Sequence, residues 1–268
     1  MRPAWGVSSV ALPQFLIPQW GAPPTVHAAF TLRAGGVSVA PFDSLNLGVH
    51  VGDDPVAVAE NRRRVGEALA LPAAPLWLEQ VHGADVFDTD RAGVESALAA
   101  AAPLPPRADA IIVRRPGVVC CIQVADCLPV LLAARDGSVI AAAHAGWRGL
   151  AAGVLENAVG AMTRPAAELV AWLGPAIGPT KFEVGAQVRE AFVSRDLAAA
   201  QAFAPNERGR WMCDLRLLAQ LRLTALGVRA VDCDRSCTAT DPQRFFSHRR
   251  DGHSGRMAAL IWLTSGTC

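Results

Sequence analysis

The stretch that decides the fold is Gln123–Gly149, which reads QVADCLPVLLAARDGSVIAAAHAGWRG. Two apolar runs flank Asp136-Gly137, a dipeptide typical of the two-residue β-hairpin turn. With these two residues in the turn, Pro129 pairs with His144 across the hairpin. The turn therefore predicts both the strand register and the face on which each side chain of the hairpin lies.

Cys127 and His144 project to the same face of this predicted hairpin, because side chains alternate along a strand. They are diagonal neighbours, roughly 7–8 Å apart at Cα and closer at Cβ, provided that no bulge interrupts the ladder. Thiolate and imidazole are both zinc ligands, so the pair indicates a shared metal site. The alternative is that both side chains simply pack in the core, and the register alone does not decide between the two.

A catalytic zinc site needs a third protein ligand beside an open position for water or substrate. His82 in LEQVHGAD lies at a predicted strand end before a glycine and is the first candidate. His50 is the main alternative for the third ligand. His248 and His253 are further candidates, but they lie in a polar, arginine-rich segment.

Composition excludes several classes of function. The 268 residues carry a formal net charge of +1 with the charges scattered, which argues against a nucleic acid or an anionic membrane as partner. No apolar run reaches the length of a membrane span, and Pro13 and Pro18 interrupt any signal-peptide core. Seven cysteines cannot all pair, so we expect reduced thiols in a cytoplasmic protein.

The predicted elements favour an α+β fold: one domain over residues 1–268, with mixed β-sheets flanked by helices. Strands outnumber helices and come in adjacent pairs. One helix is predicted from Pro55 to about Leu69 behind the cap Asp54, and another follows the cap Asp214. A third is predicted over residues 147–162, and the Pro- and Ala-rich segment 98–110 is predicted to be a surface loop.

Seven motifs occur in order along the chain: TLRAGGVS, LNLGVHVGDD, LEQVHGADV, VADCLPVLL, AAAHAGWRG, LGPAIGP and FFSHRRDG. Together they resemble the YfiH/laccase-domain family, also called polyphenol oxidase or peptidoglycan editing factor proteins. The resemblance covers about residues 28–263. It implies a single-domain α+β fold and a monomeric protein.

The same resemblance implies one metal ion, usually zinc, bound by His82, Cys127 and His144, which would then be the catalytic centre. It implies phosphorolysis of adenosine, inosine, guanosine and methylthioadenosine with phosphate, and deamination of adenosine. Copper is the alternative metal, under the older polyphenol oxidase label. Six histidines are too few for the several copper sites of a multicopper oxidase. Many relatives have cysteines after GPAIGP, where this chain has Thr180 and Lys181.

Four residues are predicted to bind substrate. Arg33 and Arg249 lie in family-like motifs, Arg148 lies in the first turn of a predicted helix, and Asn46 could bond ribose or base. Each of the four has the alternative role of a structural anchor.

Asp126 and Glu79 are the neighbouring carboxyl groups considered as proton donors, and Phe246 as a platform for a base. A second class of function uses Cys127 as a nucleophile activated by His144, in a hydrolase that edits peptidoglycan precursors. A third is a structural zinc site with four protein ligands supporting a binding surface.

Overall fold

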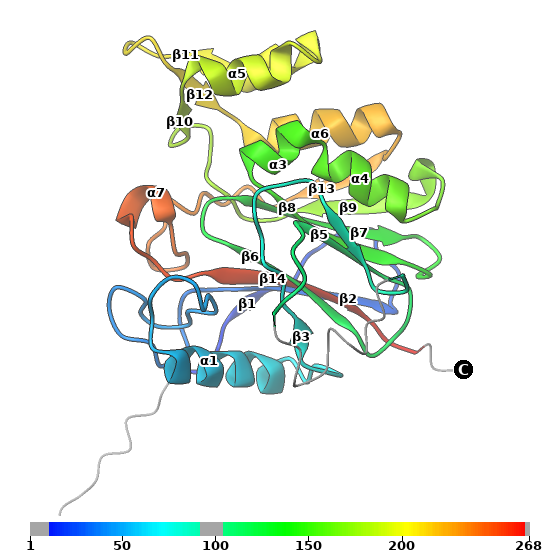
Figure 1. Cartoon of the computed structure of the whole chain (residues 1–268), viewed down its shortest axis with the longest axis vertical. Helices are drawn as coiled ribbons and strands as arrows, with labels where there is room; N and C mark the ends of the chain where they lie inside the picture. Colours follow the sequence, from blue (N-terminus) through cyan, green and yellow to red (C-terminus); the bar gives the residue numbers. More distant parts are fainter. Residues whose placement is uncertain (1–10, 92–103, 266–268) are drawn as a thin grey trace, which may run out of the picture.

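The structure is a computed structural model, which describes residues 11–91 and 104–265. Its two larger sheets stack on one another, and helices cover their outer faces (Figure 1). Parallel and antiparallel pairs occur in both sheets. The predicted α+β fold with mixed sheets flanked by helices is thereby confirmed.

The strands of residues 11–91 and 104–265 form three sheets, in each of which the spatial order differs from the chain order. The first has β1 (Phe15–Leu16), β2 (Val26–Thr31), β14 (Met257–Leu263), β6 (Val119–Val124) and β3 (Pro75–Leu76). The second has β13 (Ala230–Cys233), β9 (Leu169–Leu173), β7 (Leu128–Ala134), β8 (Ile140–Ala145), β5 (Ala110–Val113) and β4 (Val86–Asp88). The third, smaller sheet has β10 (Glu183–Val184), β12 (Trp211–Cys213) and β11 (Phe203–Pro205).

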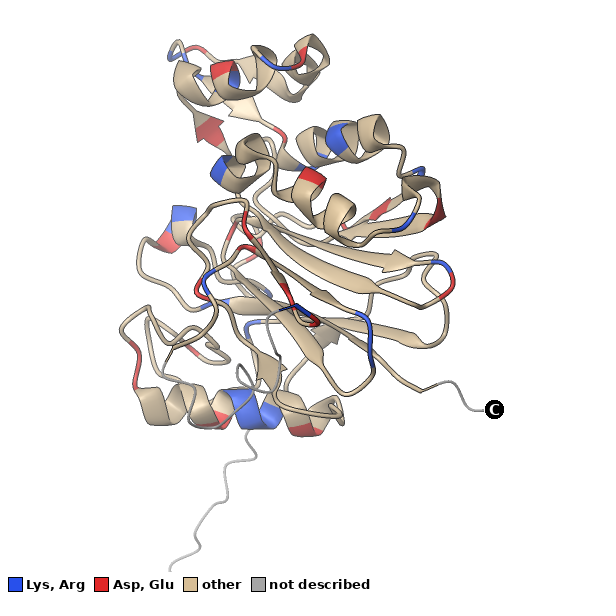
Figure 2. Cartoon of the chain, turned by 45° about the vertical axis from the view of Figure 1, so that its right-hand side comes forward, with Lys and Arg blue, Asp and Glu red and all other residues tan. Residues whose placement is uncertain are grey.

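The helices lie on both sides of the stacked sheets (Figure 1). They are α1 (Pro55–Ala68), α3 (Trp147–Ala152), α4 (Val154–Ala161), α5 (Ala186–Val193), α6 (Leu215–Leu226) and α7 (His248–Asp251), with short 3-10 turns at Ala166–Glu168 and Leu197–Ala202. In the part of the chain that the structure describes, no helix has the length and apolar character needed to cross a bilayer. Basic and acidic residues are spread over the helices, loops and strand ends, as the scattered charges of the sequence predict (Figure 2).

Three apolar layers separate the four layers of secondary structure. The innermost lies between the two large sheets and includes Ile122 of β6 and Leu131 of β7. An outer layer joins β6 to α1 through Cys121 and Val65. The opposite outer layer joins the second sheet to α3, α4 and α6. Strands buried on both faces explain why the sequence shows continuous apolar runs here rather than alternation.

The predicted helix caps agree with the structure at two helices. Asp54 accepts a hydrogen bond from the Val56 amide before Pro55, and α6 runs from the cap Asp214 to the left-handed Gly227. The single helix predicted over residues 147–162 is wrong. Gly153, with φ of 101°, ends α3 and starts α4, because only glycine adopts this conformation without strain. Of the loop predicted over 98–110, residues 98–103 lie outside the described residues, and Ala110 belongs to β5 rather than to the loop.

The hairpin register follows the prediction. Pro129 pairs with His144 between β7 and β8, and Gly137 adopts φ of 72° in the turn. Cys127 directly precedes β7 and therefore lies beside the end of β8 that carries His144. The hairpin thus places Cys127 and His144 close together at one end of the two large sheets.

Candidate metal centre and cavity

Three side chains from separate segments meet at this end of the sheets. His82 comes from the loop between β3 and β4, Cys127 from the residue before β7, and His144 from β8. One nitrogen or sulfur atom from each lies within 4.8 Å of the other two, the one such group of three in residues 11–91 and 104–265. Cys127 Sγ is 3.8 Å from His82 Nε2. These are the three residues that the sequence selected, and His50 is not in the group.

Asp109 connects two of the three candidate ligands. It is fully buried before β5, and its Oδ1 accepts hydrogen bonds from His144 Nδ1 at 2.8 Å and from the His82 amide at 2.9 Å. Its Oδ2 accepts the amides of Val81 and Gly83 at 3.1 and 2.6 Å. Since Nδ1 of His144 is engaged, Nε2 is left to face Cys127, the arrangement that orients a metal-binding imidazole.

A glycine leaves room among the three donors. A Cβ at Gly146 would lie 3.0 Å from Cys127 Sγ, 3.2 Å from His82 Cδ2 and 3.6 Å from His144 Nε2. A side chain at this position would therefore contact all three residues, and the glycine leaves the space beside them free. Two imidazoles and one thiolate around such a space are the donor set of a catalytic zinc site with three protein ligands. The residues therefore fit a metal ion.

The local charges favour an ionised thiol. Burial would raise the pKa of Cys127, but the adjacent His144 and His82 imidazoles outweigh it and lower that pKa to about 6. Burial would lower the pKa of His144, whereas Cys127 and Asp109 raise it to about 9. The two pKa values thus shift in opposite directions, which favours a thiolate at Cys127 and a protonated imidazole at His144 when no metal is bound.

The three donors lie in the wall of a cavity of about 940 Å³. Its apolar wall includes Leu76, Trp77 and Leu78, and Arg62 stacks 3.6 Å from the centre of the Trp77 ring. Further charged or titratable side chains in the wall are those of His50, Glu79, Arg148, His248 and Arg256. Burial, followed by the nearby positive charges of Arg256 and Arg62, lowers the pKa of His50.

The four predicted substrate-binding residues have different positions. Arg148 is exposed in the cavity wall. Arg33, Asn46 and Arg249 are not among the residues that line the cavity. The Arg33 guanidinium pairs with Asp43 Oδ1 at 3.0 Å.

Asn46 and Arg249 each support another segment of the chain. Asn46 is fully buried, and its Oδ1 accepts the Arg256 amide at 2.8 Å. The Arg249 side chain donates to the Glu183 carbonyl at 3.0 Å. The structure therefore places both residues as supports for neighbouring segments, and substrate contact by them stays a prediction.

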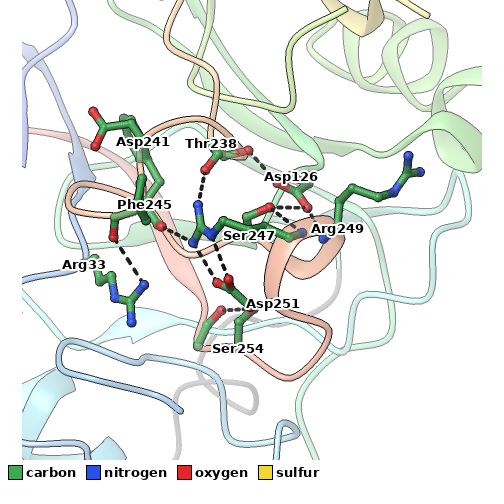
Figure 3. Close-up of polar contacts among 12 residues, drawn as sticks. Arg33, Asp126, Thr238, Asp241, Phe245, Ser247, Arg249, Asp251 and Ser254 are labelled. Carbon is green, nitrogen blue, oxygen red and sulfur yellow. Dashed lines mark hydrogen bonds and ion pairs between the residues drawn. The ribbon is translucent and has the colours of Figure 1, made fainter. Parts of the chain in front are cut away.

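Asp126 holds the C-terminal segment against the turn that carries Cys127 (Figure 3). Its carboxylate accepts hydrogen bonds from Thr238 Oγ1 at 2.6 Å, Ser247 Oγ at 3.0 Å and the Arg249 amide at 2.6 Å. Its backbone has φ of 86°. These contacts make Asp126 an anchor outside the cavity wall. Glu79 does line the cavity, whereas Phe246 is fully buried and outside that wall, so it offers no platform there.

Sequence reasoning missed Asp109, Gly146, Arg62 and Arg256. The sequence does contain a signal for Asp109. It is the one carboxylate in the apolar segment ADAIIV, and a charged side chain at the start of a buried strand needs a hydrogen-bonding partner. Arg62 lies in the NRRR run of α1, where its neighbours Arg63 and Arg64 pair with Glu60. Nothing in the local sequence distinguishes Arg62 from them.

The two stacked mixed sheets and the His-Cys-His group in a cavity wall define an α+β protein with a candidate metal centre. The family model described as multi-copper polyphenol oxidoreductase laccase matches residues 27–264, and the chain belongs to this family. The resemblance to the YfiH/laccase-domain family is thereby confirmed.

Relatives and solved structures match almost the whole chain. A purine nucleoside phosphorylase of Pseudomonas aeruginosa is 52% identical over 93% of this chain and 98% of its own length. The purine nucleoside phosphorylase YfiH of Escherichia coli is 48% identical, over 93% and 99%. A crystal structure of a Neisseria meningitidis protein has a TM-score of 0.87 at 45% identity, covering 94% of this chain and 99% of that one. YlmD from Geobacillus stearothermophilus has a TM-score of 0.82 at 33% identity, over 95% and 100%.

Proposed function

We propose that this protein is a metal-dependent purine nucleoside phosphorylase, acting on adenosine, inosine, guanosine and methylthioadenosine. The observation that carries the proposal is the cavity that joins the His82, Cys127 and His144 group to a cluster of arginines. Its volume suits a nucleoside. The names of the Pseudomonas and Escherichia relatives support the same reaction class.

In this reaction a phosphate oxygen bonds to C1′ of the ribose while the bond from C1′ to the purine nitrogen breaks. The electron pair of that bond leaves with the purine, which then takes up a proton. Arg62, Arg148 and Arg256 are the cations of the cavity wall that we assign to phosphate, because guanidinium groups bind its oxygens through paired donors. Asn46 supports this role by fixing the Arg256 backbone.

His82, Cys127 and His144 would hold the metal ion, with zinc as the proposed metal and copper as the alternative. Such an ion supplies Lewis-acid catalysis when it is bound. Asp109 fixes the imidazole of His144 and the loop of His82 in the orientation that this donor set requires. Glu79 is the carboxyl group in the cavity wall that we assign to proton transfer with the purine. Deamination of adenosine is proposed as a second reaction of the same site.

The second candidate function uses Cys127 directly as a nucleophile. The lowered pKa of Cys127 and its contact with His144 favour it, since a thiolate beside an imidazolium is the resting state of such enzymes. A hydrolase of peptidoglycan precursors would use this chemistry. It needs no metal ion, whereas the phosphorylase proposed above loses activity when the metal is removed.

The experiment compares the parent protein with Cys127→Ala and with Cys233→Ala, a control at an exposed cysteine on β13. Each protein is analysed for zinc and copper and incubated with adenosine and, separately, with inosine, guanosine and methylthioadenosine, each with and without phosphate. We expect about one zinc per chain in the parent, adenine and ribose 1-phosphate only when phosphate is present, and loss of both in Cys127→Ala alone. Inosine formation reports deamination.

Two outcomes would contradict the proposal. Chelated, metal-free protein that stays active but is inactivated by alkylation would establish the Cys127 nucleophile. A zinc-loaded protein that cleaves none of the four nucleosides would exclude purine phosphorolysis. The hydrolase and the structural zinc site would then be the functions to test.

A further inference from the structure

Gln123 is an uncommon residue for its position in the fold. It lies in β6, where the other five residues are valine, cysteine or isoleucine, and it is 6% exposed. The Gln80 side chain fixes its backbone: Gln80 Nε2 donates to the Gln123 carbonyl at 2.8 Å, and the Gln123 amide donates to Gln80 Oε1 at 2.7 Å. The backbone of Gln123 is therefore fully engaged and its orientation is fixed.

The side-chain amide of Gln123, in contrast, has a buried oxygen, Oε1, without a hydrogen-bond partner among the described residues. A few other buried side-chain atoms of the described residues also have no hydrogen-bond partner. Among these atoms, Gln123 Oε1 alone belongs to a residue that lines the cavity with the candidate metal centre. A buried amide oxygen without a partner destabilises the ligand-free protein, which points to a ligand that completes its bonds.

The surroundings indicate which part of a ligand reaches this amide. Gln123 lies on the face of β6 that it shares with Val119 and Cys121, which pack with Trp77. The same cavity wall also includes Leu76, Leu78 and Val124, and this apolar surface suits a flat, weakly polar ring. An amide presents an acceptor beside a donor, and glutamine pairs in this way with the N–H and ring nitrogen of adenine. Hypoxanthine and guanine offer an N–H donor beside a carbonyl acceptor, which is complementary as well.

We infer that Gln123 determines specificity by hydrogen bonding the edge of the purine base, at a ring position where an N–H donor adjoins an acceptor. The inference rests on the proposed function and adds to it the group that recognises the base. A purine without a substituent at C6 has acceptors but no such donor in its nucleoside, so it leaves Oε1 of Gln123 unpaired.

The test replaces Gln123 by methionine, which has similar length and no amide, and uses Gln201→Met at an exposed glutamine as control. Rates of base release are measured with adenosine and with purine riboside, which lacks the C6 substituent. We expect Gln123→Met to lower kcat/KM for adenosine by about 10–100-fold and for purine riboside by less than about twofold. The Tm of the ligand-free variant should rise by about 2–4 °C, because an unpaired buried amide is gone.

The inference would be overturned if the parent is active and Gln123→Met has the same ratio of kcat/KM for adenosine to kcat/KM for purine riboside as the parent. Equal losses on both substrates together with a lower Tm would overturn it too, since they show a structural role. Calorimetric titration with adenine separates these results from failure of the proposed function. A parent that cleaves neither nucleoside and does not bind adenine refutes both the function and the role of Gln123.

Discussion

Alanine at position 146 should disable the candidate metal centre while leaving the fold intact. The added Cβ would lie 3.0 Å from Cys127 Sγ, whereas an ordinary contact is about 3.5–4.0 Å. The sulfur must therefore move by about 0.5–1 Å, which exceeds the roughly 0.2 Å tolerance of a metal–ligand bond several-fold. The backbone itself accepts alanine, because φ of Gly146 is −59°.

We expect Gly146→Ala to bind zinc about 100-fold more weakly, which corresponds to about 2.7 kcal/mol, and to lose turnover by a similar factor. The free energy of unfolding of the metal-free protein should change by no more than about 1 kcal/mol, the usual effect at a helix N-cap. The assays are competition with a chelator, rates of phosphorolysis and denaturant unfolding. Gly160→Ala is the matched control, since nothing lies within 4 Å of a Cβ there.

Zinc affinity and turnover of Gly146→Ala within about twofold of the parent would contradict this prediction. That result would mean that His82, Cys127 and His144 do not bind one metal ion together. A large loss of stability in the metal-free variant would also count against it, because the contact would then be structural.

Four further predictions concern the same region. Asp109→Asn should weaken zinc binding about 10–100-fold and destabilise the fold by about 2–4 kcal/mol, because four donors lose their carboxylate; zinc affinity equal to the parent would argue against the role of Asp109. Zinc affinity should rise about tenfold per pH unit between about pH 6 and 9 and level off above, because the thiolate of Cys127 is already ionised and His144 must lose one proton. Calorimetry in buffers of different ionisation enthalpy checks this, and release of two protons at pH 8 would be inconsistent with it. The metal-free protein should show little change of stability from this pair in the same window, since its folded and unfolded states hold equal numbers of protons. Gly153→Ala should destabilise by about 1–2 kcal/mol because φ there is 101°, which thermal unfolding beside Gly160→Ala would measure; equal effects of the two substitutions would refute the backbone explanation.

Local signals predicted the parts of the fold that depend on neighbours in sequence. The Asp136-Gly137 turn sets the register that pairs Pro129 with His144. Asp54 and Asp214 marked the helix starts because capping is a bond to the next few amides. The prediction failed at Gly153 because the helical apolar pattern continues through it, whereas the left-handed φ of this glycine ends α3 and starts α4.

The cavity could not be predicted in this way, because its residues are selected by contacts between distant segments. Arg33 was predicted to bind substrate and Arg62 was not, yet the Arg33 guanidinium pairs with Asp43, whereas Arg62 stacks on the Trp77 ring in the cavity wall. Asp109 acts through a bond to His144 that spans 35 residues. The third ligand, His82, was selected by its position before a glycine together with the family resemblance, and not by spacing alone.

The position of β14 has a consequence for synthesis of the chain. Met257–Leu263 forms the middle strand of the first sheet, between β2 and β6. While a ribosome is still translating, β2 and β6 have emerged but lack the strand that joins them, so their apolar edges stay open. Contacts across such long separations also form slowly. The nascent chain is therefore exposed to aggregation until β14 has left the ribosome and can pair with β2 and β6, and a chaperone that shields strand edges should raise its yield.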